Sequence, residues 1–149
     1  MPKTISLTHH YTSPADLVWQ VATDLDHLKE VTKSLLSYKN MPSRQIYEGQ
    51  HLTVDVSLFG KMPYQPYEMT VEKLDHETRS FASFEKGAGV KSWQHRLQVI
   101  EDAAGSRIEE SIEIDAGVLT PVFAMWAKFM YNKRHAPRLE ILKRLEARL

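Results

Sequence analysis

The last thirty residues of the chain, 120–149, constrain its fold more than any other segment. Apolar residues recur there at offsets of three, four and seven, which is the spacing of one face of an α-helix. Thr120 is a good N-cap residue, and Pro121 suits the first helical position, where its missing N–H costs nothing. A helix of this length spans about 45 Å, so the residues before it must form something that can wrap around it. The apolar stripe consists of Val122, Phe123, Trp126, Phe129, Met130, Ile141, Leu142, Leu145 and Leu149.

Pro137 interrupts this helical pattern. A proline inside a helix lacks the N–H that would bond the carbonyl four residues earlier, and its ring crowds that carbonyl, which here belongs to Lys133. We therefore expect the helix to kink or break near residues 134–136.

The composition is that of one globular domain spanning residues 1–149, with 42% apolar residues to build a core. The formal net charge of zero argues against a nucleic-acid partner. Because the chain has no cysteine, disulfides and thiol-based metal or redox sites are excluded. The sequence has no secretory signal and no apolar stretch of about 20 residues. We therefore expect a cytoplasmic protein with no integral membrane segment.

The charge is unevenly distributed along the chain. Residues 119–149 hold seven Lys or Arg against two Glu, a net charge of +5, which leaves −5 for the rest. One interpretation is a basic surface for an anionic partner or membrane. The other, favoured because no run of like charges is long, is a solvated helix face that complements an acidic sheet. The seven cations are Lys128, Lys133, Arg134, Arg138, Lys143, Arg144 and Arg148.

Before the C-terminal helix, one predicted strand at 4–11 is followed by two short helices. Ser13 is a suitable N-cap and Pro14 a suitable first residue for the first helix. Asp24 can cap the second helix, which runs to about Val31. Six further strands, predicted from alternating apolar residues, occupy 35–40, 50–58, 67–74, 79–85, 91–100 and 107–115.

Six consecutive strands with short connections favour antiparallel pairing. The predicted fold class is α+β: a curved seven-stranded antiparallel sheet around a long C-terminal helix, with two short helices after the first strand. Only the C-terminal helix is long enough to cover the apolar face of the sheet, and a curved sheet leaves space beneath that helix. A ligand pocket would lie in this space.

A short segment after the first strand carries a resemblance to a known family. It contains a Ser13-Pro14 pair, a Val18-Trp19 pair and Asp24. In this motif and in the order of its elements, the chain resembles the START-like, or Bet v 1-like (SRPBCC), superfamily, and most of all its polyketide cyclase/dehydrase and lipid-transport branch. The resemblance covers nearly the whole chain and marks a fold rather than a chemistry.

The resemblance implies the helix-grip fold, with an apolar cavity between the sheet and the C-terminal helix. Members of the superfamily bind lipids, sterols, polyketides, quinones or plant hormones, and a few are cyclases or aromatases. Because their pocket residues vary widely, the resemblance implies no catalytic residue for this chain.

His95 and Glu110 fall on the otherwise apolar faces of two consecutive predicted strands. If the turn between these strands pairs Val99 with Ile108, then His95 and Glu110 are diagonal neighbours within side-chain reach. An imidazole beside a carboxylate in an apolar pocket could act as a general base or orient a carbonyl group. The alternatives are a buried structural pair, or a Glu110 satisfied by another partner in the core.

The predicted wall of the pocket is otherwise aromatic and apolar, and residues of these kinds also form plain core. The sequence has no spacing typical of a metal site, a phosphate-binding loop or a nucleophile elbow, so we expect no metal and no cofactor. The predicted ligand-binding residues are Tyr38, Tyr67, Trp93, His95, Glu110, Phe123, Trp126 and Met130.

The loop predicted at residues 59–66 is unusual because it is apolar. Its apolar side chains should be buried against another part of the protein, and they are Phe59, Met62, Pro63, Tyr64 and Pro66. The loop could lie over the mouth of the pocket, or it could form the contact of a homodimer.

Three functions fit these features. The first is the binding of a small hydrophobic ligand, such as a lipid, polyketide or quinone, in the cavity. The second is a polyketide cyclase or aromatase type of enzyme, in which Glu110 with His95 or a Tyr would move protons. The third is a protein-interaction module that uses the basic helix and the 59–66 loop. Polar side chains converging in a cavity would favour the enzyme, a dry apolar cavity the carrier, and a filled interior the interaction module.

Overall fold

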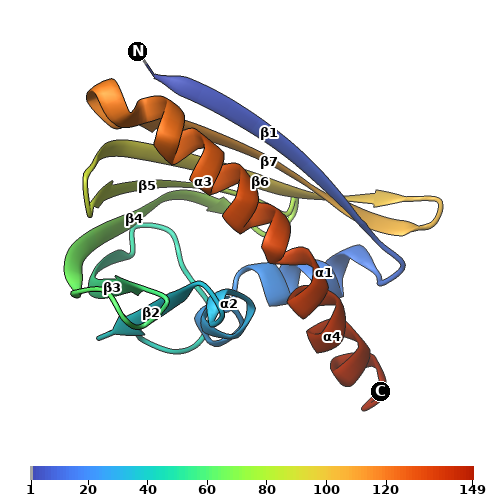
Figure 1. Cartoon of the computed structure of the whole chain (residues 1–149). Helices are drawn as coiled ribbons and strands as arrows, with labels where there is room; N and C mark the ends of the chain where they lie inside the picture. The colour runs from blue at the N-terminus through green and yellow to red at the C-terminus, as the bar shows by residue number, and fades with distance from the viewer. Residues whose placement is uncertain (1) are drawn as a thin grey trace.

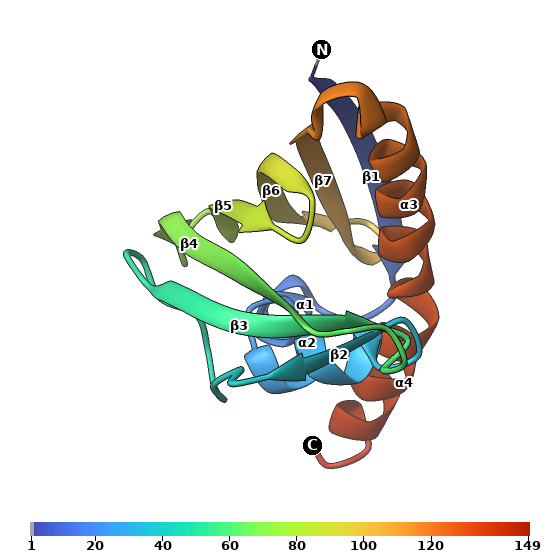
Figure 2. The same cartoon turned by 60° about the vertical axis from the view of Figure 1, so that its left-hand side comes forward.

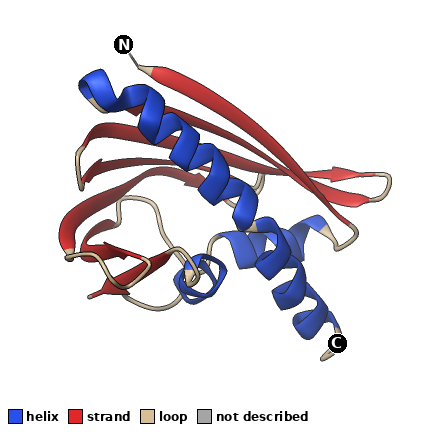
Figure 3. Cartoon of the chain, viewed as in Figure 1, coloured by secondary structure: helices blue, strands red, loops and turns tan. Residues whose placement is uncertain are grey.

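The computed structural model of the protein describes residues 2–149. These residues form a seven-stranded antiparallel sheet, two short helices and a long C-terminal helix with one break (Figures 1 and 3). The predicted α+β helix-grip fold is therefore confirmed. The elements are β1 (Lys3–Tyr11), α1 (Ala15–Ala22), α2 (Leu25–Thr32), β2 (Leu36–Lys39), β3 (His51–Leu58), β4 (Gln65–Asp75), β5 (Ser80–Gly87), β6 (Val90–Asp102), β7 (Gly105–Asp115), the short 3-10 helix η1 (Gly117–Leu119), α3 (Thr120–Lys133) and α4 (His135–Glu146).

The sheet has the strand order β1-β7-β6-β5-β4-β3-β2, and every neighbouring pair is antiparallel. Figure 2 shows the sheet curling from β1 and β7, which stand beside α3, round to β3 and β2. Two irregularities accompany this curl: the register shifts between Val71 and Lys73 in β4, and between Glu85 and Gly87 in β5. An extra residue in one strand bends it and increases its twist, so both shifts favour the curvature that separates the sheet from the helix.

The predicted strands agree with the observed ones except at their ends. One difference changes the apolar loop: β4 begins at Gln65 rather than at Tyr67. Gln65 and Pro66, which were predicted to belong to the apolar loop, instead pair with Val56 and Asp55 of β3. The loop between β3 and β4 is correspondingly shorter, at residues 59–64.

The C-terminal helix breaks at Arg134, as the position of Pro137 predicts. α3 ends at Lys133 and α4 begins at His135, so Pro137 is the third residue of α4. A proline in the first turn of a helix needs no partner for an N–H. The break therefore converts an unfavourable interior position into a tolerated terminal one.

The predicted N-cap of the C-terminal helix is wrong in detail. Thr120 is the first residue of α3, and Leu119 occupies the N-cap position. The Thr120 hydroxyl accepts a hydrogen bond from the backbone N–H of Ala116 and donates one to the carbonyl of Gly117. It therefore stabilises the turn that leads into the helix rather than the helix end itself.

The predicted cap of α1 is also wrong, because Pro14 is the N-cap residue and makes no side-chain cap. The Ser13 hydroxyl donates instead to the carboxylate of Glu146 at the end of α4. A tertiary partner has replaced the local one, and it joins the two helices. The predicted cap of α2 is confirmed, since the Asp24 carboxylate accepts two backbone N–H groups of the first turn.

The predicted apolar stripe of the C-terminal helix is only partly buried. Val122 is 62% exposed, Phe129 46% and Leu149 96%. The buried face of α3 is turned from the predicted one and includes Ala124 and Ala127. Small side chains allow the helix to approach the sheet closely, so the alanines rather than the larger apolar residues lie at the contact.

Two apolar clusters hold the helices on the sheet. One lies where α1 and α4 meet β6 and β7, and it includes Val18, Ile108 and Ile141. The other lies between α3 and strands β1, β6 and β7, and it includes Ile112 and Ala127. β3, β4 and β5 contribute little to the two clusters, although Leu74 and Phe81 pack against the first one, and the concave face of these strands borders the cavity described below. None of the described helices is both long and apolar enough to cross a bilayer.

Candidate functional site

A cavity of about 510 Å³ lies between the concave face of the sheet and α3, and α2 borders it on another side. Its wall is mostly apolar, as expected for a site that binds by burial. Apolar side chains come from β2, β3, β4, β5, β6, α2 and α3. They include Leu28, Leu36, Leu52, Val56, Met69, Val71, Phe81, Leu97 and Trp126.

The residues predicted to form the pocket wall lie around this cavity, with one exception. Tyr38, Tyr67, Trp93, His95, Phe123, Trp126 and Met130 line it. Glu110 does not, because its side chain lies behind His95 and is 1% exposed. Glu110 can therefore affect a ligand only through His95, and its prediction as a direct ligand contact is wrong.

The register of β6 and β7 brings His95 and Glu110 together as predicted. Val99 pairs with Ile108 and Leu97 with Glu110. His95 Nε2 lies 2.6 Å from Glu110 Oε2. Burial raises the pKa of the Glu110 carboxyl, but the hydrogen bond and charge of His95, with the charges of Arg138 and Arg134, outweigh burial and lower it to about 2. An ionised carboxylate only accepts hydrogen bonds, so Nε2 is the donor.

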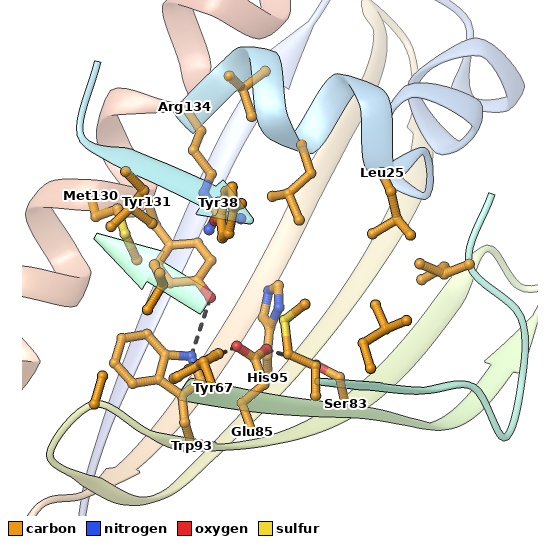
Figure 4. A pocket seen from close by; sticks show the side chains of 18 of the residues that line it. Leu25, Tyr38, Tyr67, Ser83, Glu85, Trp93, His95, Met130, Tyr131 and Arg134 are labelled. Atoms are coloured by element: carbon orange, nitrogen blue, oxygen red, sulfur yellow. Dashed lines mark hydrogen bonds between the residues drawn. The ribbon is translucent and has the colours of Figure 1, made fainter. Parts of the chain in front are cut away.

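A second carboxylate, Glu85 on β5, lines the cavity wall (Figure 4). Its Oε1 accepts a hydrogen bond of 2.9 Å from the Tyr67 hydroxyl, and its Oε2 accepts one of 3.1 Å from Ser83. Burial and the neighbouring Glu85 charge raise the pKa of Tyr67 well above its ordinary value, so this phenol stays protonated as a donor. Sequence analysis did not identify Glu85, although Phe81, Ser83 and Glu85 alternate along one predicted strand.

Two of the seven C-terminal cations also line the cavity. Arg134 is 9% exposed and Arg138 is 5% exposed. Arg138 donates to the Tyr11 hydroxyl at 3.1 Å. The interpretation of the basic segment as a solvated face is therefore wrong for these two residues. Both lie three or four residues from Met130 or Ile141 in the sequence, and this spacing was the available signal that they share the buried face.

Tyr131 completes the polar part of the wall. Its hydroxyl accepts a 3.2 Å hydrogen bond from Trp93 Nε1, and its ring lies 4.1 Å from the guanidinium carbon of Arg134 (Figure 4). Burial raises the pKa of Tyr131 and of Tyr38, so both hydroxyls stay protonated. The cavity thus combines an extended apolar wall with a small number of charged and hydroxyl groups.

No protein-family model matches the sequence, and no curated protein matches it. Solved structures do match over nearly the whole chain. CV1439 from Chromobacterium violaceum is 10% identical, with a TM-score of 0.74 over 93% of this chain and 96% of that one. Ara h 8.0201 is 12% identical, with a TM-score of 0.74 over 95% and 98%. A START superfamily protein from Mycobacterium smegmatis is 7% identical, with a TM-score of 0.71 over 95% and 98%.

The chain has the START-like, or Bet v 1-like, fold. At these identities the similarity concerns the fold and leaves the chemistry to the residues of this chain. Within the START-like framework, the apolar loop at residues 59–64 lies beside α3. Met62 and Pro63 line the cavity, and the ring of Phe59 lies edge-on to that of Trp126 with their centroids 6.1 Å apart.

The rim of the START-like cavity is apolar and exposed. Phe59 and Met62 of the loop are both more than half exposed, as are Val122 and Met125 of α3. Residues 2–149 contain no group of three or more His, Asp or Glu side chains placed to bind a metal ion. The arrangement can bury an apolar molecule, orient it by hydrogen bonds and place a carboxylate beside it.

Proposed function

We propose that the protein binds a small, largely apolar molecule in the cavity between the sheet and α3. The cavity itself carries this proposal, because its volume of about 510 Å³ lies within the range of small-molecule sites, roughly 300–1,000 Å³. Affinity would come mainly from burial, at about 25 cal/mol per Å² of apolar surface. The polar groups of the wall would set the orientation of the ligand. Lipids, polyketides and quinones are the ligand classes that such a cavity suits.

Native mass spectrometry tests this proposal. The protein is measured as purified, and again after incubation with a panel of a fatty acid, a sterol, a quinone and an aromatic polyketide. A one-to-one adduct that disappears under denaturing conditions is expected. The matched control is Val56→Trp, which places a large ring in the wall of the cavity. The proposal is overturned if the wild-type protein forms no adduct, or if every adduct that it forms also appears with Val56→Trp.

A second candidate function, a cyclase or aromatase type of enzyme, is supported by the position of Glu85. Its carboxylate is held by Tyr67 and Ser83 and borders an otherwise apolar space. A carboxylate so placed could remove a proton next to a carbonyl group, and Arg134 or Tyr131 could stabilise the resulting enolate. Glu85 is a better candidate base than Glu110, which lies behind His95.

The enzyme candidate predicts protein-catalysed exchange of the acidic protons of an apolar 1,3-diketone with deuterated solvent, followed by NMR. The exchange should be lost in Glu85→Gln and retained in Glu110→Gln. Equal exchange with and without the protein would leave ligand binding as the only supported function. A filled interior would have favoured the interaction module, and the cavity gives that candidate no support.

A further inference from the structure

Arg134 is a buried cation without a direct partner. It lies at the break between α3 and α4 and is 9% exposed. Among residues 2–149 it forms no ion pair, and its Nε has no hydrogen-bond acceptor. Its guanidinium group stacks on the ring of Tyr131, which gives it a neutral contact but no acceptor. A buried charge is costly unless it is paired and hydrogen-bonded, so Arg134 needs an explanation beyond packing.

The two carboxylates whose charges act on Arg134 are already engaged elsewhere, and a third, Asp24, lines the cavity but caps α2. Glu110 accepts from His95 at 2.6 Å, and Glu85 accepts from Tyr67 and Ser83. Neither forms an ion pair with Arg134 within the described residues. Their charges act on Arg134 only from a distance. Glu110 Oε1 is also buried without a partner, but Glu110 lies outside the cavity wall; among the described lining residues, the buried polar atom without a partner is Nε of Arg134.

A second donor lies next to Arg134. The hydroxyl of Tyr131 accepts the N–H of Trp93, so its own proton is left to donate, and no acceptor for it occurs among residues 2–149. The hydroxyl of Tyr38 lies at the same end of the cavity, where Figure 4 places it beside Arg134. Arg134 and Tyr131 thus present N–H and O–H donors that no acceptor of the described chain uses.

We infer that Arg134, with Tyr131 beside it, binds a carboxylate or comparable oxyanion on the ligand, whose apolar body lies along β3, β4 and β5. The guanidinium fork matches the two oxygens of a carboxylate better than any other side chain. The Glu85 carboxylate repels an anion, so the acidic head would lie at the Arg134 end and away from β5. This inference rests on the proposed function and narrows its ligand to a monoanionic amphiphile.

A displacement assay separates this inference from the proposed function. N-Phenyl-1-naphthylamine, which is neutral and fluoresces in apolar sites, reports occupation of the cavity. It is displaced at pH 8 by decanoic acid or by decanamide, which share their chain and differ in charge. Since a hydrogen bond to a charged group is worth several times the thermal energy, decanoic acid should displace the probe at a concentration at least about tenfold lower.

Three variants identify the source of that preference. Arg134→Met should reduce the difference between acid and amide to within about twofold, and Arg134→Lys should retain part of it. Lys128→Met removes an exposed cation from α3, the helix that ends just before Arg134, and should leave the preference unchanged. Because Arg134 is buried without a direct partner, the melting temperature of unliganded Arg134→Met should not fall below that of the wild-type protein.

The outcomes are distinguishable. If the neutral probe binds but acid and amide compete equally in the wild-type protein, the cavity stands and the role of Arg134 is wrong. This comparison does not depend on any variant folding. If Lys128→Met reduces the acid preference as much as Arg134→Met, surface charge explains it and the inference is overturned. If Val56→Trp binds the probe as well as the wild-type protein does, the probe does not occupy the cavity and the proposed function fails.

Discussion

The buried Glu110 carboxylate depends on the hydrogen bond that His95 donates to it. His95→Phe should lower the free energy of unfolding by about 3–5 kcal/mol, because it leaves the Glu110 carboxylate buried without a donor. The double variant His95→Phe/Glu110→Leu should lose less than His95→Phe alone, since no polar group is then left unpaired. Urea unfolding of the two single variants and the double variant measures this coupling. Additive losses would show that the two side chains do not act as a pair.

Glu110 also predicts how stability depends on pH. Its pKa falls from 4.5 to about 2 in the folded protein, so the folded state binds this proton less readily than the unfolded state does. The resulting stabilisation is present above about pH 4.5 and is lost as the pH falls toward about 2. The difference in free energy of unfolding between the wild-type protein and Glu110→Gln should therefore shrink between about pH 5 and pH 3. A difference that stays constant over this range contradicts an ionised, buried Glu110.

At the scale of the secondary-structure elements, replacing Pro137 should allow α3 and α4 to form one continuous helix. In Pro137→Ala, the new backbone N–H can bond the Lys133 carbonyl and join α3 to α4. Slow hydrogen exchange of this new amide, measured by NMR, is the expected result. Fast exchange of the same amide would mean that packing of Arg134 and Arg138 in the cavity, and not the proline, fixes the break.

A second prediction for the secondary-structure elements concerns the loop at residues 59–64, which a bound ligand should protect from proteolysis. Met62 and Pro63 line the cavity and Phe59 contacts Trp126, so a bound ligand should hold the loop in place. Tryptic cleavage after Lys61 should slow when N-phenyl-1-naphthylamine is present, while cleavage after the exposed Arg148 serves as the control. Equal slowing at both sites would indicate inhibition of the protease, and no slowing would argue against a lid.

The sequence predicts elements better than it predicts the site, and particular residues explain why. The register of β6 and β7 followed from the alternation and the short turn, because a one-residue shift would have placed Ile108 and Ile112 in solvent. Arg134 and Arg138 were assigned to a solvated helix face because no run of like charges is long and because such a face complements an acidic sheet. Their spacing relative to Met130 and Ile141 predicted that they share the buried face, whereas their charge predicted exposure to solvent.

At the scale of the whole molecule, the size of the cavity follows from curvature that local patterns do not encode. The register shifts in β4 and β5 bend the sheet away from α3, and the shift in β4, between Val71 and Lys73, is marked by no Gly or Pro in the sequence. The two apolar clusters hold α1, α3 and α4 mainly on β1, β6 and β7, and Trp93, Leu97 and Met130 belong both to a cluster and to the cavity wall. Core and cavity therefore share part of one apolar surface, in a fold that the solved structures share at 7–12% identity.

The position of α3 over β1 has a consequence for aggregation. β1 pairs with β7 on one side only, so it forms an edge of the sheet, and α3 packs against it (Figures 1 and 2). His9 of β1 and Asn132 of α3 are joined by a hydrogen bond of 2.9 Å. Lifting α3 from this edge would uncover backbone groups that can pair with a strand of another molecule. If the proposed ligand enters the cavity between α3 and the 59–64 loop, this edge stays covered, and ligand exchange exposes no surface that promotes self-association.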